Sequence, residues 1–427
     1  MANSHDSALK GKMLPLFLLA ASCGMYNILY LCVNFYVPFQ SSFGFTNEQM
    51  GGLLAAYAAV GTPLLFFGGM ASDIVNPKKL LVFSCILTGL CGFSLLTFPS
   101  YRVCQIIFAI LALPISFHWG AYTKCIGMMG TNEEKGRLFG TANTYDGIMT
   151  IVLSLGLTAI IGEAIGTKAG FSVLIIVLSS VYTLTGVGLI FFYDYKKWAA
   201  LNPDAANAKG EKFSLRSIVD AVKEPITWIA AFMVMGSYMA SSCLTYLSPY
   251  LNSAYVLPVA LASAFGVITR YGVKIVAAPI GGAIRDKKLG GSTPKLVWLA
   301  TAGMAIFTAV LLLVPQRDSL VVVAVVVALL IIFCYRLNNS SESTVYYGLK
   351  RTPMHLMGTI IGLASVIGYS SDLWLPRTIG SILDSNGTGG YKYVFMIMLG
   401  AMVMNSIFGF IMYRMSKKEQ AAEKAAV

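Results

Sequence analysis

The sequence has 427 residues, of which 56% are hydrophobic and 12% are charged, and its mean hydropathy is +0.71. A soluble domain carries about a quarter charged residues, so this composition excludes a soluble globular protein and predicts a chain that crosses a membrane many times. The net charge of +12 would suit a nucleic-acid-binding protein. The basic residues are instead distributed over loops and termini, and we expect no nucleic-acid partner.

Hydropathy predicts twelve transmembrane helices and therefore an all-α membrane protein. A polar, charged stretch at residues 194–225 separates two halves of six spans each. We expect an N-terminal six-helix bundle at 1–193, a cytoplasmic linker at 194–225, and a C-terminal bundle with a cytoplasmic tail at 226–427, in a monomeric protein. The predicted spans are 13–38, 47–70, 80–99, 103–125, 138–161 and 171–193, followed by 226–251, 257–284, 295–315, 319–348, 357–383 and 391–413.

The distribution of Lys and Arg predicts the orientation in the membrane. Most of the 31 basic residues fall in the termini and in the even-numbered loops, whereas the opposite side carries Arg102, Lys168, Arg317 and Lys392. By the positive-inside rule the basic side is cytoplasmic, so both termini should lie inside the cell. We expect a multi-pass membrane protein, with the lipid bilayer as its surroundings.

All eight cysteines fall inside apolar runs, and no CxxC pair is present. Buried thiols behave as small hydrophobic groups, so we expect neither disulfides nor a metal site. The sequence also lacks a phosphate-binding loop, a zinc-binding helix and a catalytic triad. These absences argue against an enzyme, and we expect no cofactor.

The two halves repeat one short pattern, a glycine followed four residues later by an aspartate and then by basic residues. It follows the second span as Gly69 to Asp73 with Lys78 and Lys79, and the eighth span as Gly282 to Asp286 with Lys287. This pattern resembles the signature loops of the major facilitator superfamily of transporters. The first copy departs from the family pattern, with Ile74 where a basic residue is usual and Asn76 where a glycine is usual.

Within that superfamily the chain is similar to a bacterial inner-membrane branch, through Gly136–Gly140, Leu257–Leu261, Lys274 and Pro279–Asp286. The resemblance implies two pseudo-symmetric six-helix bundles that alternate access to a central site. It also implies that Asp73 binds the end of a neighbouring helix and holds the outward-facing state, with Asp286 acting alike in the second half. A carboxylate near a helix N-terminus contributes about 0.3–1 kcal/mol, enough to bias two states of similar energy.

The eighth span carries two cations, Arg270 and Lys274, one helical turn apart on one face. A charge at the centre of a span is unfavourable by several kcal/mol unless it faces a partner or a wet cavity. Arg270 could hold a carboxylate or phosphate through two parallel hydrogen bonds, and Lys274 would add a point charge. The alternative is that both form structural ion pairs with acids on other spans.

Further polar side chains inside the spans predict the rest of the pathway. We expect the substrate to contact residues on the first, eighth, tenth and eleventh spans, while three titratable residues are candidates for proton coupling. Glu342 and Arg377, nearer the ends of their spans, suit gates or salt bridges better than a substrate site. The predicted substrate-binding residues are Arg270, Lys274, Arg336, Asn27, Tyr30, Asn339 and Tyr369, and the predicted proton-coupling residues are Asp146, Asp372 and His118.

Three central cations face two central carboxylates in this assignment, so one positive charge remains for a ligand to neutralise. We expect uptake of a small organic anion, such as a carboxylate, sugar acid or phosphorylated metabolite, together with protons. Two alternatives stay open: an anion exchanger without proton coupling, and a transporter-like sensor without net flux. Arginines on both the first and seventh spans, typical of organophosphate exchangers, are missing here, and so is the glycine-proline motif of drug:proton antiporters.

Overall fold

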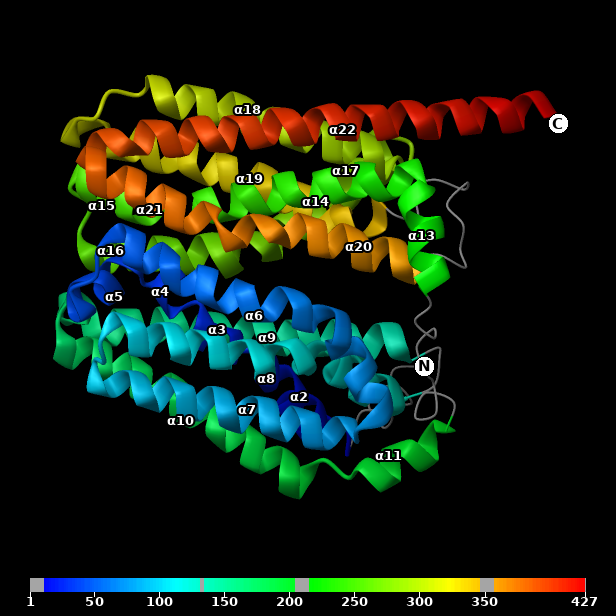
Figure 1. Cartoon of the computed structure of the whole chain (residues 1–427), viewed down its shortest axis with the longest axis horizontal. Helices are drawn as coiled ribbons and strands as arrows, with labels where there is room; N and C mark the ends of the chain where they lie inside the picture. Colours follow the sequence, from blue (N-terminus) through cyan, green and yellow to red (C-terminus); the bar gives the residue numbers. More distant parts are fainter. Residues whose placement is uncertain (1–10, 131–133, 204–214, 346–356, 427) are drawn as a thin grey trace. The chain divides into compact units, whose positions relative to one another are not determined.

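The computed structural model describes residues 11–130, 134–203, 215–345 and 357–426, and these residues form helices and short connections without a strand. Contacts divide the chain into two compact units (Figure 1). Unit 1 comprises Met1–Phe45 and Ala56–Gly210, and unit 2 comprises Thr46–Ala55 and Glu211–Val427. The prediction of an all-α membrane protein is confirmed.

Unit 1 contains the helices of the first half of the chain. Two of its long helices begin with residues typical of helix N-termini. The Asn76 side chain, just before Pro77, accepts a hydrogen bond from the backbone N–H of Lys78, and the Thr167 side chain accepts one from the backbone N–H of Gly170. The helices are α2 (Met13–Cys23), α3 (Tyr26–Leu29), α4 (Leu31–Asn34), α5 (Tyr36–Phe43), α6 (Asn47–Ile74, whose first turns belong to unit 2), α7 (Pro77–Ser94), α8 (Tyr101–Met128), α9 (Lys135–Ile161), α10 (Lys168–Phe192) and α11 (Tyr195–Leu201).

The first predicted span, 13–38, is a broken helix. It is divided into α2, α3, α4 and α5 by interruptions at Gly24–Met25, Tyr30 and Phe35. The ring of Tyr182 on α10 fills the space beside Gly24, where an added Cβ would lie 2.8 Å from its Cε1 atom. Hydropathy could not show these breaks, because it averages over the whole span and does not register contacts with distant residues such as Tyr182.

Helices α7 and α10 of unit 1 pack closely through small residues. A Cβ atom added at Gly89 would collide with the hydroxyl of Thr183, and one added at Gly92 would collide with the hydroxyl of Ser179. Small residues that let helix backbones approach are a common means of association inside membranes, where lipid removes the hydrophobic drive between helices. The glycines of α7 therefore set its distance from α10.

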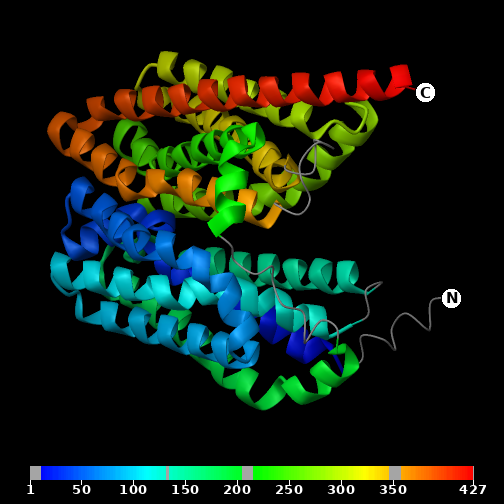
Figure 2. The same cartoon turned by 45° about the vertical axis from the view of Figure 1, so that its right-hand side comes forward.

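Unit 2 contains the helices of the second half, and α18 and α22 run side by side in both views (Figures 1 and 2). The predicted linker is partly helical, since α11 and α13 lie within residues 194–225. The helices are α13 (Leu215–Lys223), α14 (Pro225–Leu244), α15 (Leu247–Tyr255), α16 (Val259–Val267), η3 (Ile268–Gly272), α17 (Val273–Lys288), α18 (Thr293–Leu313), α19 (Val321–Val345), α20 (Met357–Tyr369), η6 (Ser370–Leu373), α21 (Leu375–Asn386) and α22 (Tyr391–Ala426).

Eight segments in the described part of the chain are long and apolar enough to cross a membrane, one of which, Thr359–Glu419, covers two predicted spans. Each of the twelve predicted ranges coincides with a continuous or interrupted helix, while the number twelve itself stays a prediction. Large apolar side chains remain exposed on the outsides of the helices, including Ile160 at 83% and Leu313 at 81%. Such surface suits contact with hydrocarbon.

Candidate functional site

The eighth predicted span changes its helical geometry at its central cation. Between α16 and α17 the chain forms the π-helical segment η3, Ile268–Gly272, which contains Arg270. π-helical turns inside α-helices are rare and occur frequently at functional sites, because they displace the following side chains and loosen the backbone hydrogen bonding. The side chains of Arg270 and Lys274 lie outside the described part of the structure, so their place near a substrate stays a prediction.

Arg336 on α19 is attached to this π-helical segment. Its Nη2 atom donates a hydrogen bond to the carbonyl oxygen of Thr269, at 3.2 Å. The guanidinium of Arg336, on the tenth span, therefore contacts the backbone of the eighth span at Thr269, the residue before Arg270. The side chain of Asn339, one helical turn further, lies outside the described residues.

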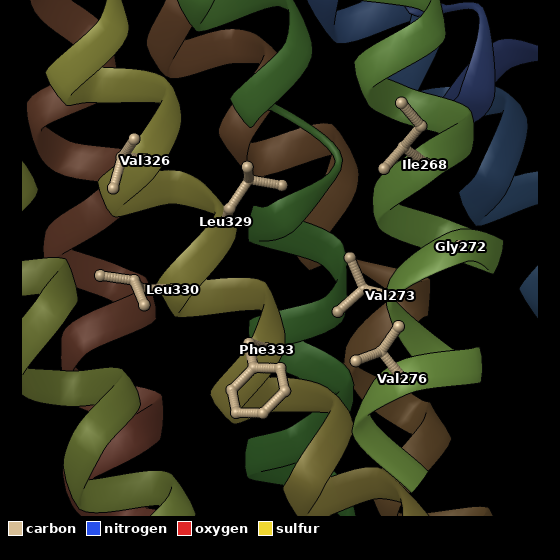
Figure 3. A pocket seen from close by; sticks show the side chains of 8 residues that line it. All are labelled: Ile268, Gly272, Val273, Val276, Val326, Leu329, Leu330 and Phe333. Carbon is tan, nitrogen blue, oxygen red and sulfur yellow. The ribbon is translucent and has the colours of Figure 1, made fainter. Parts of the chain in front are cut away.

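An open pocket of about 490 Å³ lies along the apolar face of the eighth and tenth spans (Figure 3). A ligand with a charge would lose its hydration here without gaining a polar partner. This pocket therefore suits hydrocarbon, and it is not the polar pathway predicted from the sequence. Its lining consists of Ile268, Gly272, Val273, Val276, Val326, Leu329, Leu330 and Phe333.

In unit 1, His118 on α8 is fully buried and contacts the broken first helix. Its Nε2 atom lies 2.8 Å from the hydroxyl oxygen of Ser22, and that hydroxyl lies 2.6 Å from the carbonyl oxygen of Leu19. Tyr26 meets the imidazole edge-on and Tyr122 stacks against it, with centroid distances of 5.5 and 5.6 Å. The structure therefore places His118 among aromatic and hydroxyl groups inside unit 1.

Asn27 and Tyr30, predicted to contact substrate, lie at the interruptions of the first helix. The amide of Asn27 is 2% exposed and donates a hydrogen bond to the Tyr182 hydroxyl at 2.9 Å. Tyr30 is half-buried and forms the junction between α3 and α4. The contact with Tyr182 gives Asn27 a structural role in fixing α3 against α10. A second role towards substrate stays a prediction for both residues.

The two predicted proton-coupling acids accept hydrogen bonds from neutral hydroxyls. Asp146 on α9 accepts from Thr150 at 3.4 Å, and Asp372 in η6 accepts from Ser242 of α14 at 3.0 Å. Tyr369, predicted to contact substrate, packs against Tyr238 with a centroid distance of 4.2 Å. The structure thus gathers Tyr369 and Asp372 on the same side of α14 within unit 2.

The predicted conformational-latch residues are only partly described. The surroundings of Gly69 and the side chain of Asp73 lie outside the described part of the structure. Lys78 donates a hydrogen bond from Nζ to the Ile190 carbonyl at 2.9 Å, near the C-terminal end of α10. In unit 2 Asp286 binds its neighbour Arg285 at 2.8 Å, and this hydrogen bond lowers the pKa of the exposed Asp286 carboxyl. Lys79 and Lys287 are exposed, and Gly282 is half-buried.

A carboxylate does bind a helix N-terminus in unit 2, but it is Asp384, which the sequence did not single out. Asp384 accepts the backbone N–H groups of Asn47 and Glu48 at 2.9 and 2.8 Å, at the start of α6. Arg377 pairs with Glu48 at 2.9 Å. The local signal was the reciprocal pair Thr46 and Gln49, which predicts the helix start but not its distant carboxylate partner.

Comparison with known proteins gives the family. The family model described as Major Facilitator Superfamily matches residues 13–376. The chain belongs to the major facilitator superfamily. The inner membrane protein YihN of Escherichia coli is 30% identical over 432 aligned positions, covering 97% of this chain and 99% of YihN. The E. coli inner membrane protein YqcE is 24% identical over 411 positions, covering 94% of each chain.

The same fold occurs in a solved structure, the nucleoside transporter NupG. The two superpose with a TM-score of 0.74 at 11% identity, covering 94% of this chain and 100% of NupG. At that identity the likeness shows the fold alone. Family and fold together indicate a multi-pass membrane transporter rather than an enzyme, and they confirm the resemblance that the two glycine-aspartate loops suggested.

Proposed function

We propose that this superfamily member is a secondary transporter of the inner membrane that moves a small organic anion by alternating access, coupled to protons. The observation that carries the proposal is the hydrogen bond from Arg336 to the Thr269 carbonyl. This hydrogen bond places the Arg336 guanidinium beside the π-helical segment, which includes Arg270. Two cations from different helices, beside an irregular stretch of backbone, could bind a carboxylate or phosphate group directly.

Charge within unit 2 supports an anionic ligand. The spans of this unit carry Arg270, Lys274 and Arg336 as central cations, and Asp372 as their central acid. Asp372 accepts a hydrogen bond from the Ser242 hydroxyl at 3.0 Å. A cationic excess inside a bilayer is unfavourable unless water or an anion compensates it. Binding of an anionic substrate would supply that compensation.

Proton coupling is assigned to Asp372, Asp146 or His118. Both carboxylates accept from hydroxyls, and such contacts persist when the acid is protonated, because a hydroxyl can also accept a hydrogen bond. Protonation of either acid would enlarge the cationic excess and favour the anion, which links the two binding events. The alternatives, exchange without protons and sensing without flux, require no titrating residue.

The organisation proposed for this function has two six-helix bundles, 1–193 and 226–427, a cytoplasmic linker at 194–225, and both termini inside the cell. Asp73 and Asp286, with their basic neighbours, would stabilise one of the two access states. We propose a monomer as the functional unit. Labelling of single cysteines placed at Ala2 and Ala425 in right-side-out and inverted vesicles tests the orientation, and reaction from outside would contradict it.

Uptake into proteoliposomes tests the transport proposal. Sugar phosphates, sugar acids and dicarboxylates are first screened by thermal shift, with nucleosides as the neutral comparison, because a ligand of the folded state raises the melting temperature. Radiolabelled hits are then measured with an imposed pH gradient. Acceleration by inward protons supports symport; flux only against internal substrate supports exchange; binding without flux supports a sensor. A response to nucleosides alone would contradict an anionic substrate.

A further inference from the structure

Three polar side chains that the sequence analysis did not single out meet in the interior of unit 2. Ser237 on α14 receives hydrogen bonds from the Nδ2 atoms of Asn338 on α19 and Asn405 on α22, each at 2.8 Å. The three residues are 2%, 2% and 1% exposed. We call Ser237, Asn338 and Asn405 the amide cluster.

Close helix packing creates the amide cluster. Gly236 precedes Ser237 on α14, and a Cβ added there would lie 3.0 Å from both the Cβ of Asn405 and the carbonyl oxygen of Ala401. The absence of a side chain at Gly236 therefore lets α22 approach α14 until the Asn405 amide reaches the hydroxyl. Burial of three polar groups at such a contact requires that their hydrogen-bonding capacity be satisfied.

That capacity is not satisfied by the described residues. The Oδ1 atoms of Asn338 and Asn405 are buried and have no hydrogen-bond donor among them. Turning either amide by 180° exchanges its nitrogen and oxygen, but the Ser237 hydroxyl has one proton to donate. At least one amide oxygen therefore needs a donor from elsewhere, whichever orientation is taken.

We propose that the amide cluster binds an internal water molecule that donates to an amide oxygen and bridges α14, α19 and α22. Water supplies two donors in the volume of one small molecule, and buried waters typically make about three hydrogen bonds to groups of this kind. A sodium ion also binds amide oxygens, but the amide cluster contains no carboxylate, and Arg336 lies two residues before Asn338 on α19. An added cation would increase the positive charge of the region, whereas water is neutral.

A high-resolution structure of the full-length protein, solved once in sodium chloride and once in choline chloride, tests the water site. We expect density within hydrogen-bonding distance of an Asn338 or Asn405 amide oxygen in both salts, and equal melting temperatures in the two. Absence of density would overturn the proposal. Density confined to the sodium structure, with a sodium-specific rise of several degrees in melting temperature, would also overturn it, in favour of a cation site.

Variants separate the site from general packing. Asn405→Leu removes one amide and should abolish or displace the density, because the bridge loses one of its three helices. Thr301→Val is the matched control, since the Thr301 hydroxyl is also fully buried in unit 2 but is satisfied by carbonyls of its own helix. The control should leave the density unchanged. Unchanged density in Asn405→Leu would contradict a site built by the amide cluster.

Discussion

The Nε2 atom of His118 and the hydroxyl of Ser22 lie 2.8 Å apart between α8 and the end of α2. Because the Ser22 hydroxyl proton points to the Leu19 carbonyl at 2.6 Å, the hydroxyl oxygen is left to accept, and Nε2 must be the protonated nitrogen of the ring. The Nδ1 atom of the buried imidazole has no hydrogen-bond partner among the described residues. His118 therefore presents an acceptor at Nδ1 while its other nitrogen fixes the broken helix.

Ser22→Ala should destabilise the protein by about 1–3 kcal/mol, because it leaves the Nε2–H of a buried imidazole without an acceptor. Thermal unfolding in detergent measures the effect, followed by the rise in fluorescence of a thiol-reactive probe as unfolding exposes the free cysteines. The matched control is Thr158→Val on α9, whose buried hydroxyl bonds back to its own helix at the Ser154 carbonyl. Equal melting temperatures for the two variants would refute a special role of the Ser22–His118 contact.

Arg336→Ala should reduce anion transport by at least about 10-fold, since a charge-assisted contact to substrate contributes about 1.5–3 kcal/mol and the link to η3 is lost as well. Arg336→Lys keeps the charge and should recover part of the rate, but it cannot reproduce the planar two-bond geometry. Initial uptake rates per folded protein are compared in proteoliposomes. Wild-type transport in Arg336→Ala would remove this residue from the substrate site.

Asp146→Asn and Asp372→Asn should distinguish the coupling acid from a structural one. The amide keeps a hydrogen-bond acceptor for Thr150 or Ser242 but cannot bind a transferable proton. The variant at the coupling site should lose uptake driven by a pH gradient and retain exchange of internal for external substrate. If both variants keep gradient-driven uptake, neither acid couples protons, and His118→Gln becomes the remaining test.

Asp384→Asn should lower the free energy of unfolding by about 0.5–2 kcal/mol, because it removes the negative charge that accepts the N–H groups of Asn47 and Glu48. Arg377→Gln breaks an exposed ion pair with Glu48 and should change stability by less than about 1 kcal/mol. Chemical unfolding of both variants ranks the two contacts. A larger loss for Arg377→Gln would show that the ion pair, and not the helix cap, holds the start of α6.

Gly92→Ala should destabilise unit 1, because the new methyl group would collide with the Ser179 hydroxyl and push α7 from α10. We expect about 1–3 kcal/mol, read from thermal unfolding. Gly400→Ala on α22 provides the control, since no atom beyond the adjoining backbone of its own helix lies within 4 Å of the added group. That substitution should be neutral or slightly stabilising, because alanine favours helix more than glycine does. Equal behaviour of the two would contradict the close packing of α7 and α10.

The sequence by itself determined the class of protein and the positions of most helices. An apolar run long enough to span hydrocarbon must satisfy its backbone internally, so hydropathy predicts helices such as α7, α10 and α18 within a few residues of their observed bounds. The spaced glycine and aspartate of the two loops indicated the family, which the match over residues 13–376 confirms.

Only the tertiary structure decided where the helices break and which polar groups meet. The break of the first helix at Gly24 lies against Tyr182, distant in sequence, and the Thr269 carbonyl of the π-helical segment accepts a hydrogen bond from Arg336 on another helix. Asn338 and Asn405 both donate hydrogen bonds to Ser237, although the neighbouring Asn339 was the residue predicted from sequence. Hydropathy averages over a span and carries no record of partners, because each contact depends on the distance and rotation between helices.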